Sequence, residues 1–218
     1  MRKAIKSVDD LKAGYLQLME DFMFERIPRD VRLGLVNLSL SIGSEAAQKI
    51  AQEAKADDPL LIARQLGVEV NWTSRDNLMG TLLVRSEYYP PASIRIYEKS
   101  ITQLKTAVEK LELEDLFPPQ KMDTLHIAHE LFHHIEKTRI GVLSEAYPVE
   151  TLRWGPIRLK SQIRALSEIG AGTFSKNLVG AKVSPKLLDY LISADKAREL
   201  PYKLKELEAM PGPFLYSS

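Results

Sequence analysis

All four histidines of this 218-residue chain lie within eleven consecutive positions, 126 to 136, which read HIAHELFHHIE. At about 100° per residue on an α-helix, His126, His129 and His133 fall within roughly 60° of one another, with Glu130 beside them. The opposite arc is apolar and consists of Ile127, Ala128, Leu131, Phe132 and Ile135. The stretch therefore predicts an amphipathic helix that packs its apolar face on a core and presents imidazoles on the other face.

Within this helix, HELFH (129–133) matches the pattern HExxH. Residues four apart on a helix project side by side, so His129 and His133 can meet one metal ion at about 2 Å. Glu130 is placed to take a proton from a water on that metal. We therefore predict a zinc site with Glu130 as the catalytic base, although two imidazoles and a carboxylate also suit manganese, iron or cobalt.

The two other histidines fit this site less well. His126 lies one turn too early to reach a metal held between His129 and His133, and His134 is rotated by about 100° from that face. We expect both to lie at the surface or behind the ligands rather than to bind the metal.

A catalytic zinc usually has three protein ligands and one open position. Because the chain has no cysteine and no further histidine, the third ligand must be a carboxylate, and the downstream candidates include Glu136, Glu145, Glu150 and Glu168. We favour Glu168, because small residues on its helical face would let two helices approach closely; they are Ala171, Gly172 and Ser175. The hydroxyl of Tyr147 or Tyr97 could contact a developing oxyanion, although nothing in the sequence singles out either tyrosine.

Composition excludes several classes of protein. The net charge of +1 gives no electrostatic footprint for direct binding of nucleic acid or a membrane surface. The absence of cysteine excludes disulfides and a cysteine nucleophile, and it fits a reducing compartment. The N-terminal residues MRKAIKSVDDLKAGY lack the apolar core of a signal peptide, and no apolar run has the length of a membrane span. We expect a cytoplasmic protein.

Hydrophobic periodicity and turn residues predict an α+β fold, mostly helical, in which the histidine helix packs on a small antiparallel or mixed sheet. Helices are expected at 8–23, 44–56 with Ser44 as N-cap, 58–67, 101–111, from a cap at Asp123 or Thr124 onward, 159–179, and from Ser184. A loop that contains Gly155 and Pro156 is expected before the helix at 159–179. Short strands are expected at 68–72, 81–86 and 93–97. The stretch LGLVNLSLSIG alternates partly like a strand and fits neither type securely. These elements suggest an N-terminal extension (1–43), a metallopeptidase-like domain (44–197) and a C-terminal tail (198–218).

Four stretches, in order, resemble the ImmA/IrrE family of zinc-dependent metallopeptidase-like proteins: DDPLLIARQLGVEV, the strands MGTLLV and SIRIY, LHIAHELFHHIE, and EIGAGTFSKNLV. The resemblance covers about residues 45–195. It implies a zincin-like fold of the gluzincin type, zinc bound by His129, His133 and Glu168, Glu130 as base, and cleavage of a DNA-binding repressor.

The chain departs from the family pattern in several places. Phe132 replaces the usual glycine, which we expect to narrow the cleft, and Gly172 and Ser175 stand where asparagine and alanine are common. Residues 100–121 resemble an inserted helix. The first 43 residues contain no recognisable helix-turn-helix, so a repressor would be a separate chain.

These observations predict a zinc metallopeptidase that cleaves a protein substrate. The main alternative is a regulatory module that binds metal and a partner protein without cleaving it. A purely structural metal is a weaker alternative, because the ligand set leaves an open coordination position. Glu130 favours the enzyme, since a binding module does not need it. We expect SIRIY (93–97) to be a sheet edge that receives an extended substrate peptide.

Overall fold

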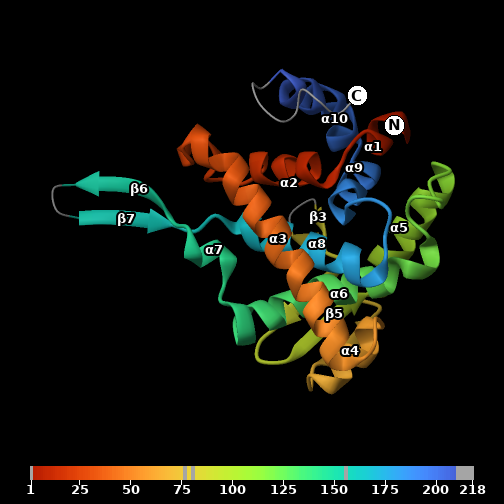
Figure 1. Cartoon of the computed structure of the whole chain (residues 1–218). Helices are drawn as coiled ribbons and strands as arrows, with labels where there is room; N and C mark the ends of the chain where they lie inside the picture. The colour runs from red at the N-terminus through yellow and green to blue at the C-terminus, as the bar shows by residue number, and fades with distance from the viewer. Residues whose placement is uncertain (1, 76–77, 80–81, 155–156, 210–218) are drawn as a thin grey trace.

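The computed structural model describes residues 2–75, 78–79, 82–154 and 157–209. It is an α+β fold in which most residues are helical (Figure 1). The α-helices are α1 (Arg2–Lys6), α2 (Asp10–Met19), α3 (Arg29–Ala54), α4 (Pro59–Gln65), α5 (Glu98–Lys110), α6 (Met122–Ile135), α7 (Leu143–Ala146), α8 (Arg164–Val179), α9 (Asp189–Ile192) and α10 (Ala194–Glu208). The tighter 3-10 turns are η1 (Phe24–Arg26), η2 (Pro119–Lys121) and η4 (Pro185–Leu188), and η3 (Glu136–Ile140) is a π-helical turn.

The strands are β1 (Glu69–Thr73), β2 (Leu78–Met79), β3 (Leu82–Leu83), β4 (Ser86–Tyr89), β5 (Ser93–Tyr97), β6 (Val149–Trp154) and β7 (Ile157–Ser161). The main sheet has the order β1–β5–β4, with β1 parallel and β4 antiparallel to β5, so it is mixed. The prediction that SIRIY forms an edge was wrong, because this segment is β5 and pairs on both sides. Its Ile94 and Ile96 are fully buried. Among the described strands of this sheet, β1 and β4 form the edges.

Three helices stack behind the sheet. Strands β4 and β5 contact α6, α6 contacts α8, and α8 contacts α3 (Figure 1). The last contact depends on Gly43, because a β-carbon at this position would lie 2.3 Å from the carbonyl oxygen of Gly170. Glycine is therefore required for α3 and α8 to lie this close, and α8 is fixed between α3 and the histidine helix.

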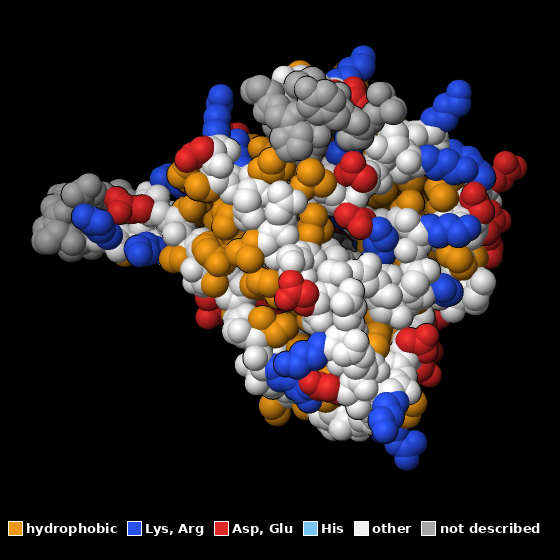
Figure 2. Space-filling view, viewed as in Figure 1, with side chains coloured by type: hydrophobic (Ala, Val, Ile, Leu, Met, Phe, Trp, Pro, Cys, Tyr) orange, Lys and Arg blue, Asp and Glu red, His pale blue; other side chains and the backbone are white. Residues whose placement is uncertain are grey.

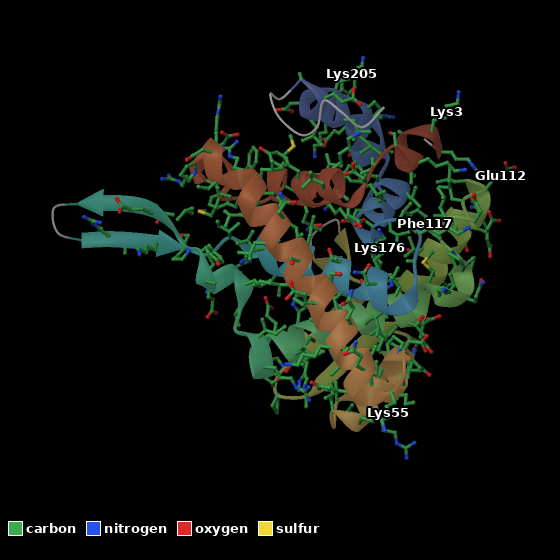
Figure 3. All side chains as sticks on the ribbon, viewed as in Figure 1. Lys3, Lys55, Glu112, Phe117, Lys176 and Lys205 are labelled. Atoms are coloured by element: carbon green, nitrogen blue, oxygen red, sulfur yellow. The ribbon has the colours of Figure 1, made fainter. Side chains whose placement is uncertain are left out.

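Helix α3 differs from what the sequence suggested. We expected Ser44 to cap a helix, but Ser44 lies inside α3, which ends at Ala54 and is followed by Lys55 in the left-handed backbone region (φ 52°; Figure 3). The stretch LGLVNLSLSIG resembled a strand because α3 carries apolar residues on two stripes. One stripe, with Val36 and Ala47, is buried, whereas Leu35 and Ile42 are half-buried. Figure 2 shows hydrophobic side chains gathered along α3. The predicted division between residues 43 and 44 falls within this continuous helix.

A second difference lies at residues 149–161, which we expected to be a loop followed by the start of a helix. Residues 149–154 and 157–161 form the β6–β7 hairpin, which projects from the body of the molecule, and α8 begins only at Arg164 (Figure 1). The segment VETLRW–IRLKS has the alternating pattern of a two-stranded hairpin around Gly-Pro. Arg26 in η1 attaches the hairpin by donating a hydrogen bond to the carbonyl of Thr151 (2.7 Å).

The remaining elements largely follow the sequence signals. Asp58 caps α4 by accepting a hydrogen bond from the amide of Leu60, and Ser184 caps η4. Helix α6 begins at Met122 without a side-chain cap, so the predicted capping by Asp123 or Thr124 was wrong. The predicted tail contains α10 up to Glu208, while residues 210–218 lie outside the described residues. Within the described ranges, every helix is too short or too polar to cross a bilayer.

Candidate metal centre

Helix α6 fixes the direction in which its histidines point. The apolar arc predicted from the sequence is buried, with Ile127, Ala128 and Leu131 fully inaccessible, so the opposite arc must face away from the core. On that arc the side chains of His129 and His133 keep 24% and 17% of their surface exposed. Their rings meet edge to face with centroids 5.2 Å apart. The two imidazoles therefore lie together and accessible to an ion.

Helix α8 brings Glu168 to the same place. Oε2 of Glu168 lies 3.2 Å from Nε2 of His129, and Oε1 lies 3.5 Å from Nε2 of His133. One ligand atom from each of these three residues lies within 4.8 Å of the others. His129, His133 and Glu168, the metal triad, thus form a group that could hold a metal ion, and the HxxxH spacing fits the HExxH pattern.

The close approach of α8 to α6 has a different cause from the one we predicted. Among the described residues, none outside the helix's own backbone and the chain neighbours would come within 4 Å of a β-carbon added at Gly172, which lines a cavity, so Gly172 is not a packing contact. Gly170 is the contact, since a β-carbon there would lie 2.8 Å from the ring of Phe132. Phe132 is fully buried against Gly170 and Phe174. The expectation that Phe132 narrows the cleft was therefore wrong, because its ring points into the core.

The electrostatics of the triad favour a positive charge. Burial acts to raise the pKa of Glu168, but its hydrogen bond with His129 and the nearby charges of His129, His133 and Lys186 outweigh burial and lower the pKa to about 2. Burial acts to lower the pKa of His133, yet its contact with Glu136 and the charges of Glu168 and Glu130 raise it to about 9. Two nitrogen donors and one carboxylate in such surroundings fit a divalent cation such as zinc.

Glu130 lies beside the triad, with only 7% of its surface exposed. Its Oε1 accepts a hydrogen bond of 2.7 Å from the hydroxyl of Ser86, the first residue of the edge strand β4. Glu130, Ser86 and all three triad residues line one cavity of about 1110 Å³. The predicted base, the triad and a sheet edge thus face the same space.

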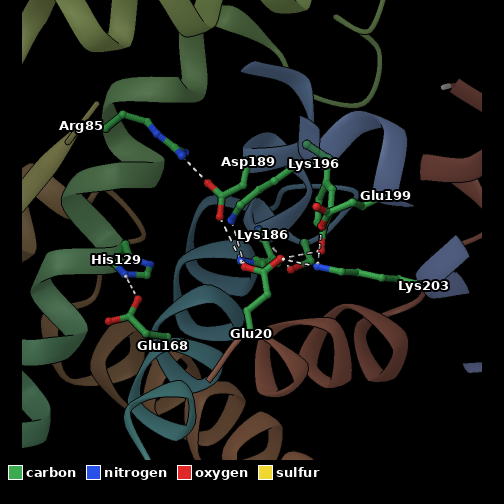
Figure 4. Close-up of polar contacts among 11 residues, drawn as sticks. Glu20, Arg85, His129, Glu168, Lys186, Asp189, Lys196, Glu199 and Lys203 are labelled. Carbon is green, nitrogen blue, oxygen red and sulfur yellow. Dashed lines mark hydrogen bonds and ion pairs between the residues drawn. The ribbon is translucent and has the colours of Figure 1, made fainter. Parts of the chain in front are cut away.

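A second group of charged residues lines or adjoins this cavity and was not predicted. We call it the ion cluster; it consists of Glu20, Arg85, Lys186, Asp189, Lys196 and Lys203 (Figure 4). Oε2 of Glu20 accepts from Lys186 (2.6 Å) and Lys196 (2.9 Å). Asp189 accepts from Arg85 and from Lys186 (3.0 Å). The cluster joins the residue after α2, the residue before β4, and the C-terminal helices.

Figure 4 shows the ion cluster and the His129–Glu168 pair on the same side of α6. Burial acts to raise the pKa of Glu20, but the charge of Lys186 and hydrogen bonds from the lysines and Tyr190 lower it to about 2. The pKa of Asp189 is also lowered, because Arg85 and Lys186 outweigh its burial. The two carboxylates are therefore ionised and neutralised within the protein.

The structure places His126 and His134 outside the triad. Both are buried rather than at the surface. Nδ1 of His126 lies 2.8 Å from the carbonyl of Met122, and because a carbonyl only accepts, this nitrogen carries the hydrogen. Burial and the charge of Arg85 lower the pKa of His126 to about 3. Nδ1 of His134 lies 3.1 Å from the hydroxyl of Tyr88. His126 lines the same cavity as the triad, whereas His134 contacts Tyr88.

The two tyrosines considered for the oxyanion do not line the cavity. Tyr97 follows Ile96 on β5 and so points to the opposite face of the sheet, where its hydroxyl donates to Glu87. Tyr147 ends α7 with 42% of its surface exposed. Glu145 lines the cavity, but neither it nor Glu150 belongs to the triad.

Comparisons with protein-family models, curated proteins and solved structures found no match to this chain. A function must therefore be inferred from the geometry of the site and the pattern of its residues.

Proposed function

We propose that this protein is a zinc-dependent metallopeptidase that cleaves a protein substrate. The observation that carries this proposal is the convergence of His129, His133 and Glu168, with Glu130 beside them in one cavity. The ligand set is that of a gluzincin-like site, as the resemblance to the ImmA/IrrE family implies. The same resemblance supports a DNA-binding repressor, supplied as a separate chain, as the substrate.

Zinc bound to the triad would supply a Lewis acid that polarises a peptide carbonyl and makes water a better nucleophile at neutral pH. The chain's own contribution to proton transfer is Glu130, whose carboxylate can accept a proton and return it to the leaving amine. Ser86 donates to Oε1 of Glu130 and so fixes the orientation of the carboxylate, while Oε2 is the atom left to hold the transferred proton.

The edge strand β4 supports a peptide substrate. The amide of Tyr97 donates to the carbonyl of Arg85 (2.9 Å), which marks these two residues as a hydrogen-bonded pair of the β4–β5 ladder. In an antiparallel ladder the bonding alternates, so the backbone groups of Ser86 and Tyr88 point away from β5. An extended peptide could add to these groups next to Glu130. This arrangement favours flexible segments over folded ones as substrates.

The substitution Glu130→Gln tests the enzymatic proposal, because it keeps the shape of the side chain and removes the base. With a peptide library from digested cell extract as probe, the zinc-loaded protein should produce new peptide termini by mass spectrometry. The variant should bind about one zinc per chain but cleave at least about 100-fold more slowly. A zinc chelator should abolish cleavage by the unsubstituted protein.

If both forms bind zinc and neither cleaves any peptide, the metallopeptidase proposal fails. Equal binding of a repressor by both forms, without cleavage, would then favour the regulatory module.

The role of β4 is tested by comparing Tyr88→Pro with Tyr88→Ala. Both variants lose the phenol ring, but only proline loses the outward amide that would bind the peptide. Losing one such hydrogen bond, worth about 1 kcal/mol, should lower kcat/KM about fivefold below that of Tyr88→Ala. Equal kcat/KM values in the two variants, measured on a peptide found in the library, would exclude this edge as the binding strand.

A further inference from the structure

Glu136 has an unusual position for a carboxylate. It follows the last residue of α6 as the first residue of the π-helical turn η3, and only 2% of its surface is exposed. Its Oε1 accepts hydrogen bonds from the amide of Leu143 (2.8 Å) and the hydroxyl of Ser167 (2.6 Å). Its Oε2 lies 3.5 Å from Nδ1 of His133. One buried side chain therefore contacts α6, α7 and α8.

The chain returns to Glu136 because of the turn after η3. The amide of Gly141 donates to the carbonyl of Glu136 (2.8 Å), and Gly141 has φ 97°, a conformation that favours glycine. This reversal brings the first amides of α7 back to the end of α6. The amide of Ser144 then donates to the hydroxyl of Ser167 (3.1 Å), which itself donates to Glu136. The hydroxyl of Ser167 therefore accepts one hydrogen bond and donates another, which fixes its position.

Ser167 is the residue before Glu168, the carboxylate of the metal triad. Glu136 is therefore connected to two ligands: to His133 through Nδ1, and to the backbone that carries Glu168 through Ser167. It is not placed as a ligand itself, because His133 presents its other nitrogen, Nε2, to Glu168. The carboxylate lies on the side of the ring away from the triad.

The contact with His133 has a chemical consequence. An ionised carboxylate only accepts hydrogen bonds, so Nδ1 of His133 carries the hydrogen in that contact. In the neutral ring the lone pair is then on Nε2, which is the atom that faces the triad. A carboxylate in this position fixes both the tautomer and the orientation of a metal-binding histidine.

We propose that Glu136 is a positioning residue for the metal centre, which holds His133 in the tautomer that binds metal through Nε2 and sets the place of Glu168 through Ser167. This inference rests on the metal centre proposed above. It adds a role that the sequence did not indicate, since Glu136 was considered there only as a possible ligand.

The variant Glu136→Gln tests the proposal. Its amide oxygen can still accept from Leu143 and Ser167, but its NH₂ group then faces Nδ1 of His133. To accept from that group, the ring must move its hydrogen to Nε2, the metal-binding atom. We expect zinc affinity, measured by competition with a chromophoric chelator, to fall about 10- to 100-fold. The visible spectrum of the cobalt-loaded protein should also change.

Glu145→Gln is the matched control, because Glu145 also lines the cavity but lies outside the triad. This variant should bind zinc as tightly as the unsubstituted protein. The thermal midpoint of metal-free Glu136→Gln separates positioning from folding: a change in zinc affinity with an unchanged midpoint supports the proposal. Equal zinc affinity in Glu136→Gln and the unsubstituted protein would overturn it.

A second measurement needs no variant and applies even if Glu136→Gln does not fold. In the zinc-loaded protein, ¹⁵N NMR should show His133 with hydrogen on Nδ1 and metal on Nε2. The reverse assignment would overturn the role of Glu136 and leave the metallopeptidase proposal intact. Failure of the unsubstituted protein to bind zinc would overturn both.

Discussion

The metal triad and the ion cluster lie on the same side of α6, but their charges are balanced in different ways (Figure 4). In the ion cluster, Glu20 accepts from three lysines and from the hydroxyl of Tyr190. In the triad, the imidazole of His133 lies near three carboxylates, those of Glu130, Glu136 and Glu168, and that of His129 contacts Glu168. The first group is neutralised by lysine and arginine side chains, whereas the second depends on imidazole rings, which exist in both a charged and a neutral form.

Burial acts to raise the pKa of both Glu20 and Glu168, yet both values are held at about 2. For Glu20 the compensating positive charges are those of lysine side chains. For Glu168 the compensating imidazoles must become neutral before they can bind a metal, and the positive charge must then come from the ion. Two partly exposed carboxylates with similarly lowered pKa values thus have different surroundings: Glu20 is enclosed by lysines, and Glu168 belongs to a group that could hold a metal ion.

The largest expected effect comes from removing a member of the triad. His129→Ala, His133→Ala or Glu168→Ala should reduce zinc from about one ion per chain to an undetectable level after dialysis, because two protein ligands do not hold a catalytic zinc. Elemental analysis of the purified variants measures this. Glu145→Ala and Glu150→Ala should keep their zinc. Loss of zinc in Glu145→Ala would show that the third ligand has been misassigned.

A smaller effect is expected from a substitution in the ion cluster, and it should change the free energy of unfolding rather than the zinc affinity. Glu20→Ala leaves Lys186, whose side chain is 7% exposed, without one of its two carboxylates. Breaking a buried ion pair in this way should lower the free energy of unfolding by about 3 kcal/mol. Denaturant titration of metal-free protein measures it, and zinc affinity should not change.

Glu53→Ala is the control for this prediction. It removes an ion pair with Arg139 in which both side chains are more than 40% exposed, so less than about 1 kcal/mol should be lost. Equal losses of unfolding free energy in Glu20→Ala and Glu53→Ala would mean that the burial of the ion cluster does not strengthen its ion pairs.

The smallest expected effect is the pH dependence of the unfolding free energy that Glu20 contributes. The pKa of Glu20 is about 2 in the folded protein and about 4.5 in an unfolded chain, so its contribution is fully present above pH 4.5 and disappears as the pH falls through 2. The difference in unfolding free energy between the unsubstituted protein and Glu20→Ala should therefore shrink between pH 5 and 2. A difference that stays constant over this range would contradict the ionised Glu20.

Features that depend on neighbours along the chain could be predicted from the sequence. The spacing of HELFH was sufficient to predict α6, its buried face and the pairing of His129 with His133, because these follow from helical periodicity. Glu168 was also placed correctly, although the packing argument was only partly right: Gly170, not Gly172, receives Phe132.

The parts that could not be predicted depend on residues far apart in sequence. Lys186 and Glu20 are separated by 166 positions, and no local pattern indicates that they pair. Likewise, β4 and not β5 is the edge strand beside the metal centre because β1 pairs with β5, which is a long-range choice. The role of Glu136 requires the reversal at Gly141 and the contact with Ser167, and these exist only in the folded chain.

The continuity of α3 has a practical consequence for protein engineering. Asp10 and Gln17 of α2 and Leu40 of α3 line the same cavity as the triad, and Gly43 seats α3 against α8. The first 43 residues therefore contribute side chains to the cavity that contains the triad, and they include the glycine at which α3 meets α8. A transplant of the candidate metal centre into another scaffold should include these helices, because they form one wall of the cavity in which the triad lies.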